Sequence, residues 1–237
     1  MKKILLSIAL CCAATNFFAQ DVNTAQLVNE GKAALEAKNY QEAYTKFSTY
    51  LTQTNNQDSV IAYNCGVCAD KIKKPADALK YFDIAVQKKY NLANAYIGKA
   101  GALKDLKKND EYVATLKEGL EANPGNKTLT KMYATYYVNQ GILAQKAQKM
   151  AAAEEAFKQA IAIQEDNVNA LNSLGSLYYS KGANTMKTDA EKAKVEFKEA
   201  KGYLDKLIPL LSADKPAQKK MMDNAKTMLN FIDSQLQ

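Results

Sequence analysis

The sequence contains no histidine, no tryptophan and no arginine, so all of its 32 basic residues are lysine. Without histidine the chain lacks the usual general base of neutral pH and the commonest zinc ligand. Without arginine it lacks the planar guanidinium group that binds a carboxylate, a phosphate or a guanine base through paired hydrogen bonds. These absences exclude most common catalytic arrangements and most arrangements that read nucleic-acid bases.

Proline and glycine are scarce as well, with 4 and 10 residues among 237. Both residue types mark turns, whereas long stretches rich in alanine, lysine and glutamate favour helix. The chain is 47% hydrophobic and 24% charged, which is usual for a folded protein. The composition therefore predicts a folded, mainly helical chain.

The first twenty residues, "MKKILLSIALCCAATNFFAQ", resemble a secretory signal peptide. Two lysines precede an apolar core from Ile4 to Ala14, which is too short to span a bilayer. The sequence predicts a signal peptide over residues 1–20, with cleavage after either Ala19 or Ala14. No later apolar run is long enough for a membrane helix.

Export would place the protein in the periplasm or in association with the outer envelope. A lipid anchor on Cys11 or Cys12 is an alternative, which Leu10 disfavours because a small residue normally precedes a lipidated cysteine. Removal of the two N-terminal lysines would lower the net charge from +7 to about +5. The basic surface suits an acidic partner, although a lysine-rich surface also serves solubility.

An internal repeat runs through the remainder of the chain. In "VNEGKAALEAKNYQEAYTKFSTYL" and "YNCGVCADKIKKPADALKYFDIAVQ", a glycine precedes an alanine by twelve residues, and this alanine precedes a phenylalanine by four. The first segment has Gly31 and Phe47 at these places, and the second has Gly66 and Phe82. Three further segments follow the same frame through Ala100, Tyr112, Leu116 and Gly119, through Ala134, Ala153, Phe157 and Ala160, and through Gly175, Ala193, Phe197 and Ala200.

The repeat predicts five units over residues 24–211, in which small residues lie where two amphipathic helices cross. The units are expected at 24–58, 59–92, 93–126, 127–167 and 168–211, followed by a capping helix within 212–237. A single helix pair cannot bury its apolar face, so the units are expected to stack.

Several local features refine this prediction. Asp58 or Ser59 is expected to cap a helix, and Pro75 to lie in the first turn of the next one. The fourth unit gains seven residues, which predicts a long first helix running to about Met150. The fifth unit gains six residues, so "KGANTMKTD" is expected to form a longer loop, with Thr188 as the next helix cap.

The spacing resembles the tetratricopeptide repeat, a helix–turn–helix unit of about 34 residues. The segments "NYQEAYTKF", "NDEYVATLKEGLEANPGN", "AAAEEAFKQAIAI" and "LNSLGSLYYSKG" carry the resemblance. It implies an all-α, right-handed α-solenoid of about five repeats with a C-terminal capping helix, here of an exported bacterial type.

The resemblance also implies that the first helix of each unit lines a concave groove. Residues at the second, fifth, sixth, ninth, twelfth and thirteenth positions of a unit are expected to point into it. The partner-binding candidates are Val28, Lys32, Glu36, Tyr63, Asn64, Val67, Lys71, Asn94, Ile97, Lys104, Lys131, Thr135, Asn139, Asn169, Asn172, Ser176 and Tyr179.

These amide, lysine and aromatic groups would suit an extended, acidic peptide, although they also fit an ordinary solvated face. Only Asn64 falls on a position of the carboxylate clamp found in some family members, which argues against recognition of a C-terminal carboxylate. The leading hypothesis is a non-enzymatic scaffold or adaptor of the bacterial cell envelope. One alternative is a structural envelope protein that acts by self-association or cell-wall contact.

A second alternative is a thiol oxidoreductase that uses Cys65 and Cys68, a C-x-x-C pair. A redox pair needs a lowered thiol pKa at a helix N-terminus, and these residues are expected two turns into a helix. A zinc site would need two more ligands. Buried free thiols are therefore expected, with a local disulfide as the alternative.

Other ligand classes are not supported by the sequence. The segment "GLEANPGNKT" lacks the contiguous Gly-Lys-Ser/Thr of a phosphate-binding loop. The clusters of lysine residues contain no arginine, the residue that most often recognises nucleic-acid bases. We expect no nucleotide, nucleic acid, metal or cofactor, and the oligomeric state stays open.

Overall fold

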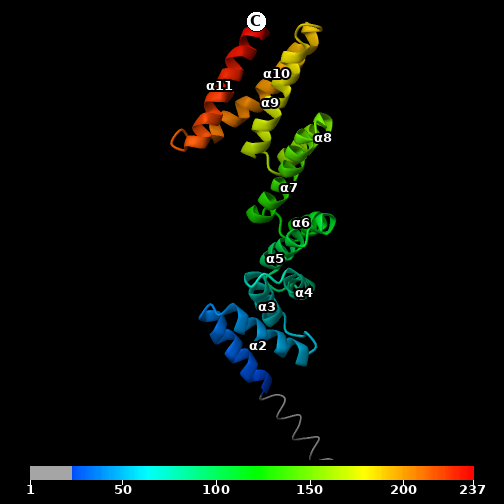
Figure 1. The fold of residues 1–237 in the computed structure, drawn as a ribbon, viewed down its shortest axis with the longest axis vertical. Helices are drawn as coiled ribbons and strands as arrows, with labels where there is room; N and C mark the ends of the chain where they lie inside the picture. Colours follow the sequence, from blue (N-terminus) through cyan, green and yellow to red (C-terminus); the bar gives the residue numbers. More distant parts are fainter. Residues whose placement is uncertain (1–22) are drawn as a thin grey trace, which may run out of the picture. The chain divides into compact units, whose positions relative to one another are not determined.

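The computed structural model describes residues 23–237, which are helical apart from short turns (Figure 1). The described residues form two compact units, which divide between Asn126 and Lys127. The predicted signal peptide over residues 1–20, including Cys11 and Cys12, lies outside the described residues. Across residues 23–237, no helix combines the length and the apolar composition that crossing a membrane requires.

The first unit consists of helices that each pack against the next one along the chain. Residues 23–36 are helical, and α2 (Tyr40–Gln53), α3 (Ser59–Lys71), α4 (Pro75–Gln87), α5 (Leu92–Asp105) and α6 (Asn109–Ala122) follow. Asp58 caps α3 through hydrogen bonds from the backbone N–H groups of Val60 and Ile61, at 2.9 and 3.0 Å. Pro75 begins α4, so both local predictions are confirmed.

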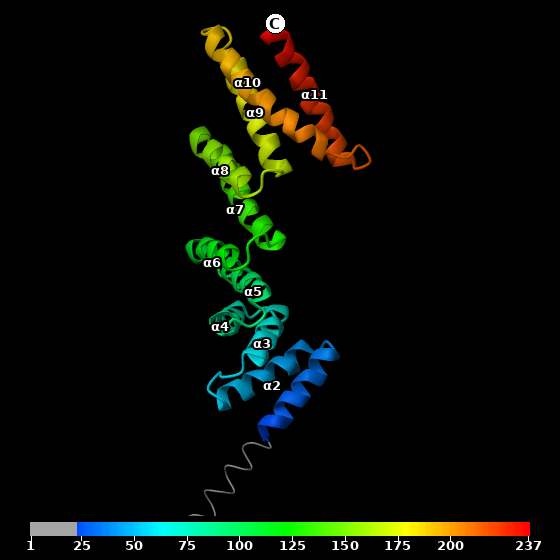
Figure 2. The same cartoon turned by 180° about the vertical axis from the view of Figure 1, so that it is seen from behind.

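The second unit contains two helix pairs and a final helix. Its elements are α7 (Lys127–Lys146), α8 (Met150–Ile163), α9 (Val168–Thr185), α10 (Ala190–Leu207), the short 3₁₀ helix η1 (Ile208–Leu210) and α11 (Pro216–Leu236). Figures 1 and 2 show α11 alongside α10 and α9, and it contacts both. Ala225 and Ile232 of α11 are buried in the core of this unit. The predicted helix pairs and the predicted capping helix are confirmed.

The turn inside a helix pair uses a left-handed residue that is not glycine. Lys38, Lys73, Lys107 and Gln148 have φ values of 59°, 60°, 59° and 58°. At Lys73 the two hydrogen bonds of a Schellman motif form, from its own N–H to the Asp70 carbonyl and from the Lys74 N–H to the Ala69 carbonyl. This motif ends the first helix abruptly although no glycine marks the position.

Two predicted helix boundaries are wrong. The helix expected to run to about Met150 ends at Lys146, because Gln148 adopts the left-handed conformation and Met150 already begins α8. The expected loop "KGANTMKTD" is helical as far as Thr185. Asp189, and not Thr188, caps the next helix, since its side chain accepts a hydrogen bond of 2.9 Å from the Lys192 N–H.

Four of the described helix pairs share a close crossing between a glycine of the first helix and a phenylalanine of the second, whereas α6 contains no phenylalanine and the α5–α6 pair lacks this contact. The contacting pairs are Gly31 with Phe47, Gly66 with Phe82, Gly141 with Phe157, and Gly182 with Phe197. In the first three pairs the phenylalanine follows the glycine by sixteen residues, and in the last by fifteen. The crossing glycines therefore set a common register for these pairs.

This register corrects the sequence-based frame of the two longer units. Ala134 is buried, but Gly141 is the residue under Phe157. Gly175 lies under Leu204 and not under Phe197. The seven extra residues of the fourth unit therefore lie at the start of α7. Seven residues are about two helical turns, so Ala134 and Gly141 lie on the same face of α7. The buried face of α7 was therefore predicted correctly, but the residue that contacts Phe157 was not.

Candidate interaction groove

The predicted groove residues all lie on first helices of the pairs, and none of them is buried. In the first unit these residues are Val28, Lys32 and Glu36 on the helix over residues 23–36, Tyr63, Asn64, Val67 and Lys71 on α3, and Asn94, Ile97 and Lys104 on α5. In the second unit they are Lys131, Thr135 and Asn139 on α7, and Asn169, Asn172, Ser176 and Tyr179 on α9.

Some of these side chains already have partners within the chain. The ring of Tyr63 makes edge-to-face contacts with Phe82 and Tyr90, each with centroids 5.8 Å apart. The ring of Tyr179 lies 5.6 Å from that of Phe231, which belongs to the capping helix α11. Tyr179 is therefore taken up largely by intramolecular packing, which the sequence did not indicate.

A cavity of about 300 Å³ lies between α9 and the end of the α7–α8 pair. It is lined by Gln145, Met150, Ser176, Leu177, Ser180, Lys181 and Asn184. The crossing glycine is the eighth residue of a unit, as Gly31 is in the unit over residues 24–58. Counted from Gly141, Gln145 therefore takes the twelfth position of its unit. Counted from Gly182, Ser176 and Ser180 take the second and sixth positions of theirs. These are positions that the resemblance assigns to the groove. We call this cavity the α9 cavity.

A second cavity, of about 360 Å³, adjoins α9 on the side of the capping helix. Asn172 and Ser176 line it from α9, and Asn224, Thr227 and Met228 line it from α11. Ser176 lines both cavities, so a continuous stretch of α9 from Asn172 to Asn184 faces open space. Asn172 and Ser176 were among the sequence-based candidates, whereas Gln145 and Ser180 were missed.

An ion-pair cluster supports one wall of the α9 cavity. Glu154 of α8 accepts hydrogen bonds from the Lys158 ammonium at 2.6 Å and from the Tyr178 hydroxyl at 2.5 Å. Its second carboxylate oxygen pairs with the ammonium of Lys181, a residue that lines the cavity. The Lys181 nitrogen also lies 4.8 Å from the centre of the Tyr178 ring, within the range of a cation–π contact. The cluster holds α8 against α9 and fixes the position of Lys181.

The protonation of this cluster follows from its contacts. Burial would raise the pKa of the Glu154 carboxyl, but hydrogen bonds from Lys158, Lys181 and Tyr178 lower its pKa to about 2. The hydrogen bond to Glu154 in turn raises the pKa of Lys158. At neutral pH one carboxylate is therefore shared by two ammonium groups, and the three side chains carry a net charge of +1.

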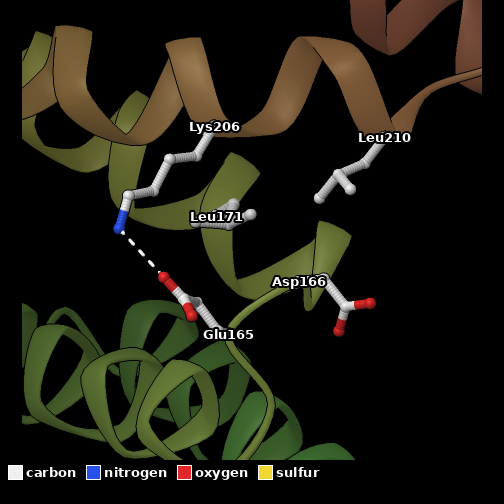
Figure 3. Close-up of a pocket in the computed structure, with 5 residues that line it drawn as sticks. All are labelled: Glu165, Asp166, Leu171, Lys206 and Leu210. Carbon is white, nitrogen blue, oxygen red and sulfur yellow. Dashed lines mark hydrogen bonds and ion pairs between the residues drawn. The ribbon is translucent and has the colours of Figure 1, made fainter.

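Another pocket, of about 380 Å³, lies where the α8–α9 turn meets the end of α10. In Figure 3 Leu171 and Leu210 provide its apolar surface, and Lys206 reaches towards Glu165, with 3.5 Å between Nζ and Oε1. Asp166 completes the lining. Glu165 is 85% exposed and Lys206 is 60% exposed, so this ion pair is a weak surface interaction. None of the predicted groove residues lines this pocket.

The cysteine pair does not form a reactive site. Cys65 and Cys68 are free thiols with no exposed area. Burial raises the pKa of the Cys65 thiol well above its usual range and raises the pKa of Cys68 to about 11. Redox catalysis requires a lowered thiol pKa and access to substrate, so the geometry supports the packing role that was predicted.

A tetratricopeptide repeat family model matches residues 138–185, a range that contains every residue lining the α9 cavity. The chain is similar to a TPR repeats protein from Bacteroides fragilis of known crystal structure, with 47% identity and a TM-score of 0.67 over 86% of this chain and 98% of that one. It also resembles YrrB, described as a TPR protein with an unusual peptide-binding site, with 14% identity and a TM-score of 0.51 over 85% and 90% of the chains. The likeness to YrrB concerns the fold alone. A search of curated proteins finds no match.

Proposed function

The chain belongs to the tetratricopeptide repeat family, and we propose that it is a non-enzymatic interaction scaffold that binds a segment of a partner protein along α9. The α9 cavity is the observation that supports this most directly. Its volume is at the lower end of the range for ligand pockets, which suits one side chain of a partner.

The chemistry of the surface fits an extended segment. Asn172, Ser176 and Asn184 present amide and hydroxyl groups along one stretch of α9. Such groups both donate and accept hydrogen bonds, as the backbone of an extended peptide requires. The fold of YrrB, which carries a peptide-binding site, is similar to that of this chain.

We further propose that the scaffold acts in the bacterial cell envelope, in the periplasm or in association with the outer envelope. The apolar segment within residues 1–20, with its two lysines, supports this location. Expression with a C-terminal tag, followed by cell fractionation, tests the proposal. Recovery of the protein only from the cytoplasm would contradict it.

Filling the α9 cavity tests the proposed binding surface. Ser180 is an exposed residue of α9, so Ser180→Trp should occupy the cavity without disturbing the core. Val195, 60% exposed on α10, provides the matched control Val195→Trp. Tagged wild type and both variants would be cross-linked in cells that make the protein, and captured proteins would be identified by mass spectrometry.

We expect wild type and Val195→Trp to capture the same partner, and Ser180→Trp to lose it. Capture of one set of proteins by all three would contradict binding at the α9 cavity.

A structural role through self-association is the second candidate, since Ile142, Leu143 and Met150 expose apolar side chains at the end of the α7–α8 pair. Sedimentation of the purified protein over a concentration series separates the two functions. A concentration-dependent dimer lost in Leu143→Ser would favour self-association.

A further inference from the structure

The lining of the α9 cavity has a definite chemical character. Met150 and Leu177 form apolar walls, and Ser176, Gln145 and Asn184 contribute uncharged polar groups. Lys181 is the single charged residue among those described as lining it. Among these described lining residues there is no carboxylate, so an entering anion would meet no like charge on the walls.

The charge of Lys181 is only partly neutralised by its own partner. Glu154 pairs with Lys181 but also with Lys158, so one negative charge serves two positive ones. An ammonium has three N–H donors, and the Glu154 carboxylate accepts one of those of Lys181. The Lys181 side chain remains 36% exposed. It can therefore donate to a second carboxylate without losing the first.

Nearby donors would support that carboxylate. The Ser176 hydroxyl and the Asn184 carboxamide line the same space and carry O–H and N–H donors. The Ser180 hydroxyl donates to the Ser176 carbonyl at 2.9 Å, so its lone pairs rather than its proton face other groups. These donors would hold a carboxylate through charge-assisted hydrogen bonds. They would therefore bind a carboxylate more tightly than an uncharged group of the same shape, such as a carboxamide.

We infer that the α9 cavity binds a glutamate side chain of the partner segment. Its methylene groups lie between Met150 and Leu177, and its carboxylate accepts from Lys181 and Ser176. The inference rests on the proposed function, because it names the chemistry that the same groove recognises.

Two short peptides test this specificity on the full chain. The first is an acetylated, amidated pentapeptide with a central glutamate flanked by leucines, and the second has glutamine in its place. Each would be titrated at low salt into isotope-labelled protein, with amide shifts as the readout. We expect the glutamate peptide to bind about ten-fold more tightly, since a charge-assisted hydrogen bond differs from a neutral one by roughly this factor. The largest shifts should fall at Ser176, Ser180 and Asn184.

Lys181→Gln should reduce the ten-fold preference to about one. Lys194→Gln removes the same charge from an exposed position on α10 and should leave the preference unchanged. Because Lys181 also pairs with Glu154, a second variant leaves that pair intact. Ser180→Asp places a carboxylate in the cavity and should make the glutamine peptide bind more tightly than the glutamate peptide.

Equal binding of both peptides by wild type, or a preference that survives Lys181→Gln, overturns the inference. Shifts that map elsewhere overturn it as well. Peptide binding at α9 without a preference for glutamate leaves the proposed function standing. The proposed function itself fails if partner capture is insensitive to Ser180→Trp.

Discussion

Replacing the glycine at a helix crossing by alanine tests the register that positions the groove. A Cβ atom placed on Gly141 would lie 2.6 and 2.7 Å from two carbons of the Phe157 ring, and closer still to a third. Phe157 has no exposed area, so its ring cannot move towards solvent. Protein interiors are packed as densely as organic crystals, and the added methyl group must displace either the ring or the helix.

The expected magnitude follows from two opposed effects. Alanine is favoured over glycine inside a helix by about 1 kcal/mol. An extra carbon in a filled core costs about 1–3 kcal/mol. At Gly202 in α10 an added Cβ atom would meet no atom within 4 Å, so Gly202→Ala shows the helix preference alone. The two variants share that preference, and the free energy of unfolding should differ between them by about 1–3 kcal/mol, with Gly141→Ala the less stable.

Hydrogen exchange followed by mass spectrometry is the appropriate assay, because it reports opening free energies separately for peptides of α7 and α8, which contain the Gly141–Phe157 contact, and of α10, which contains Gly202. Bulk unfolding curves average over two compact units that need not unfold together. Equal opening free energies in Gly141→Ala and Gly202→Ala would refute the contact with Phe157. The crossing residue would then be Ala134, as the sequence-based frame assumed.

Lys73→Gly should raise the opening free energy of the α3–α4 pair by about 1 kcal/mol in hydrogen exchange, because lysine is strained at a φ of 60°; Lys74→Gly, at a φ of −110°, should bring no such gain, and equal effects would contradict the reasoning. Since the pKa of Glu154 falls to about 2 on folding, its stabilising contribution is complete above the unfolded pKa of about 4 and is lost as the pH falls through about 2. Glu154→Gln should cost about 2 kcal/mol at pH 7 and flatten the acid-unfolding profile, and an unchanged profile would contradict the ion-pair cluster. Cys65 and Cys68 should resist iodoacetamide at pH 8 until the protein is unfolded, as peptide mapping would show; absence of labelling after unfolding would reveal a disulfide instead.

The helix pairs could be predicted because small and large residues must alternate where two helices cross. The spacing from Gly31 to Phe47 and from Gly66 to Phe82 sufficed to identify them. The end of α7 was missed for a local reason. Its left-handed residue is Gln148, and glutamine carries none of the preference for that conformation that makes glycine a recognisable helix end.

The candidate site could be predicted only in part. Asn172 faces a cavity as expected, because its helical face was identified correctly. Gln145 was missed because the frame was placed on Ala134, two turns before Gly141. The sixteen-residue spacing to Phe157 was present in the sequence and would have corrected this. By contrast, nothing in the sequence indicated that Phe231 of α11 would cover Tyr179.

The α9 cavity combines regular groove positions with side chains next to the helix crossing. α9 has 18 residues and α5 has 14, and because only three residues of α9 follow Gly182, its additional residues lie before the crossing. Gly182 permits the end of α9 to lie against Phe197, and the Thr185 hydroxyl secures this end by donating to Glu196 at 2.7 Å. The same end of the helix carries Lys181 and Asn184 into the lining. A displacement of this end of α9 would therefore move the cation that we assign to glutamate recognition. Selectivity should thus depend on the end of α9 around Gly182, while the buried crossings supply stability.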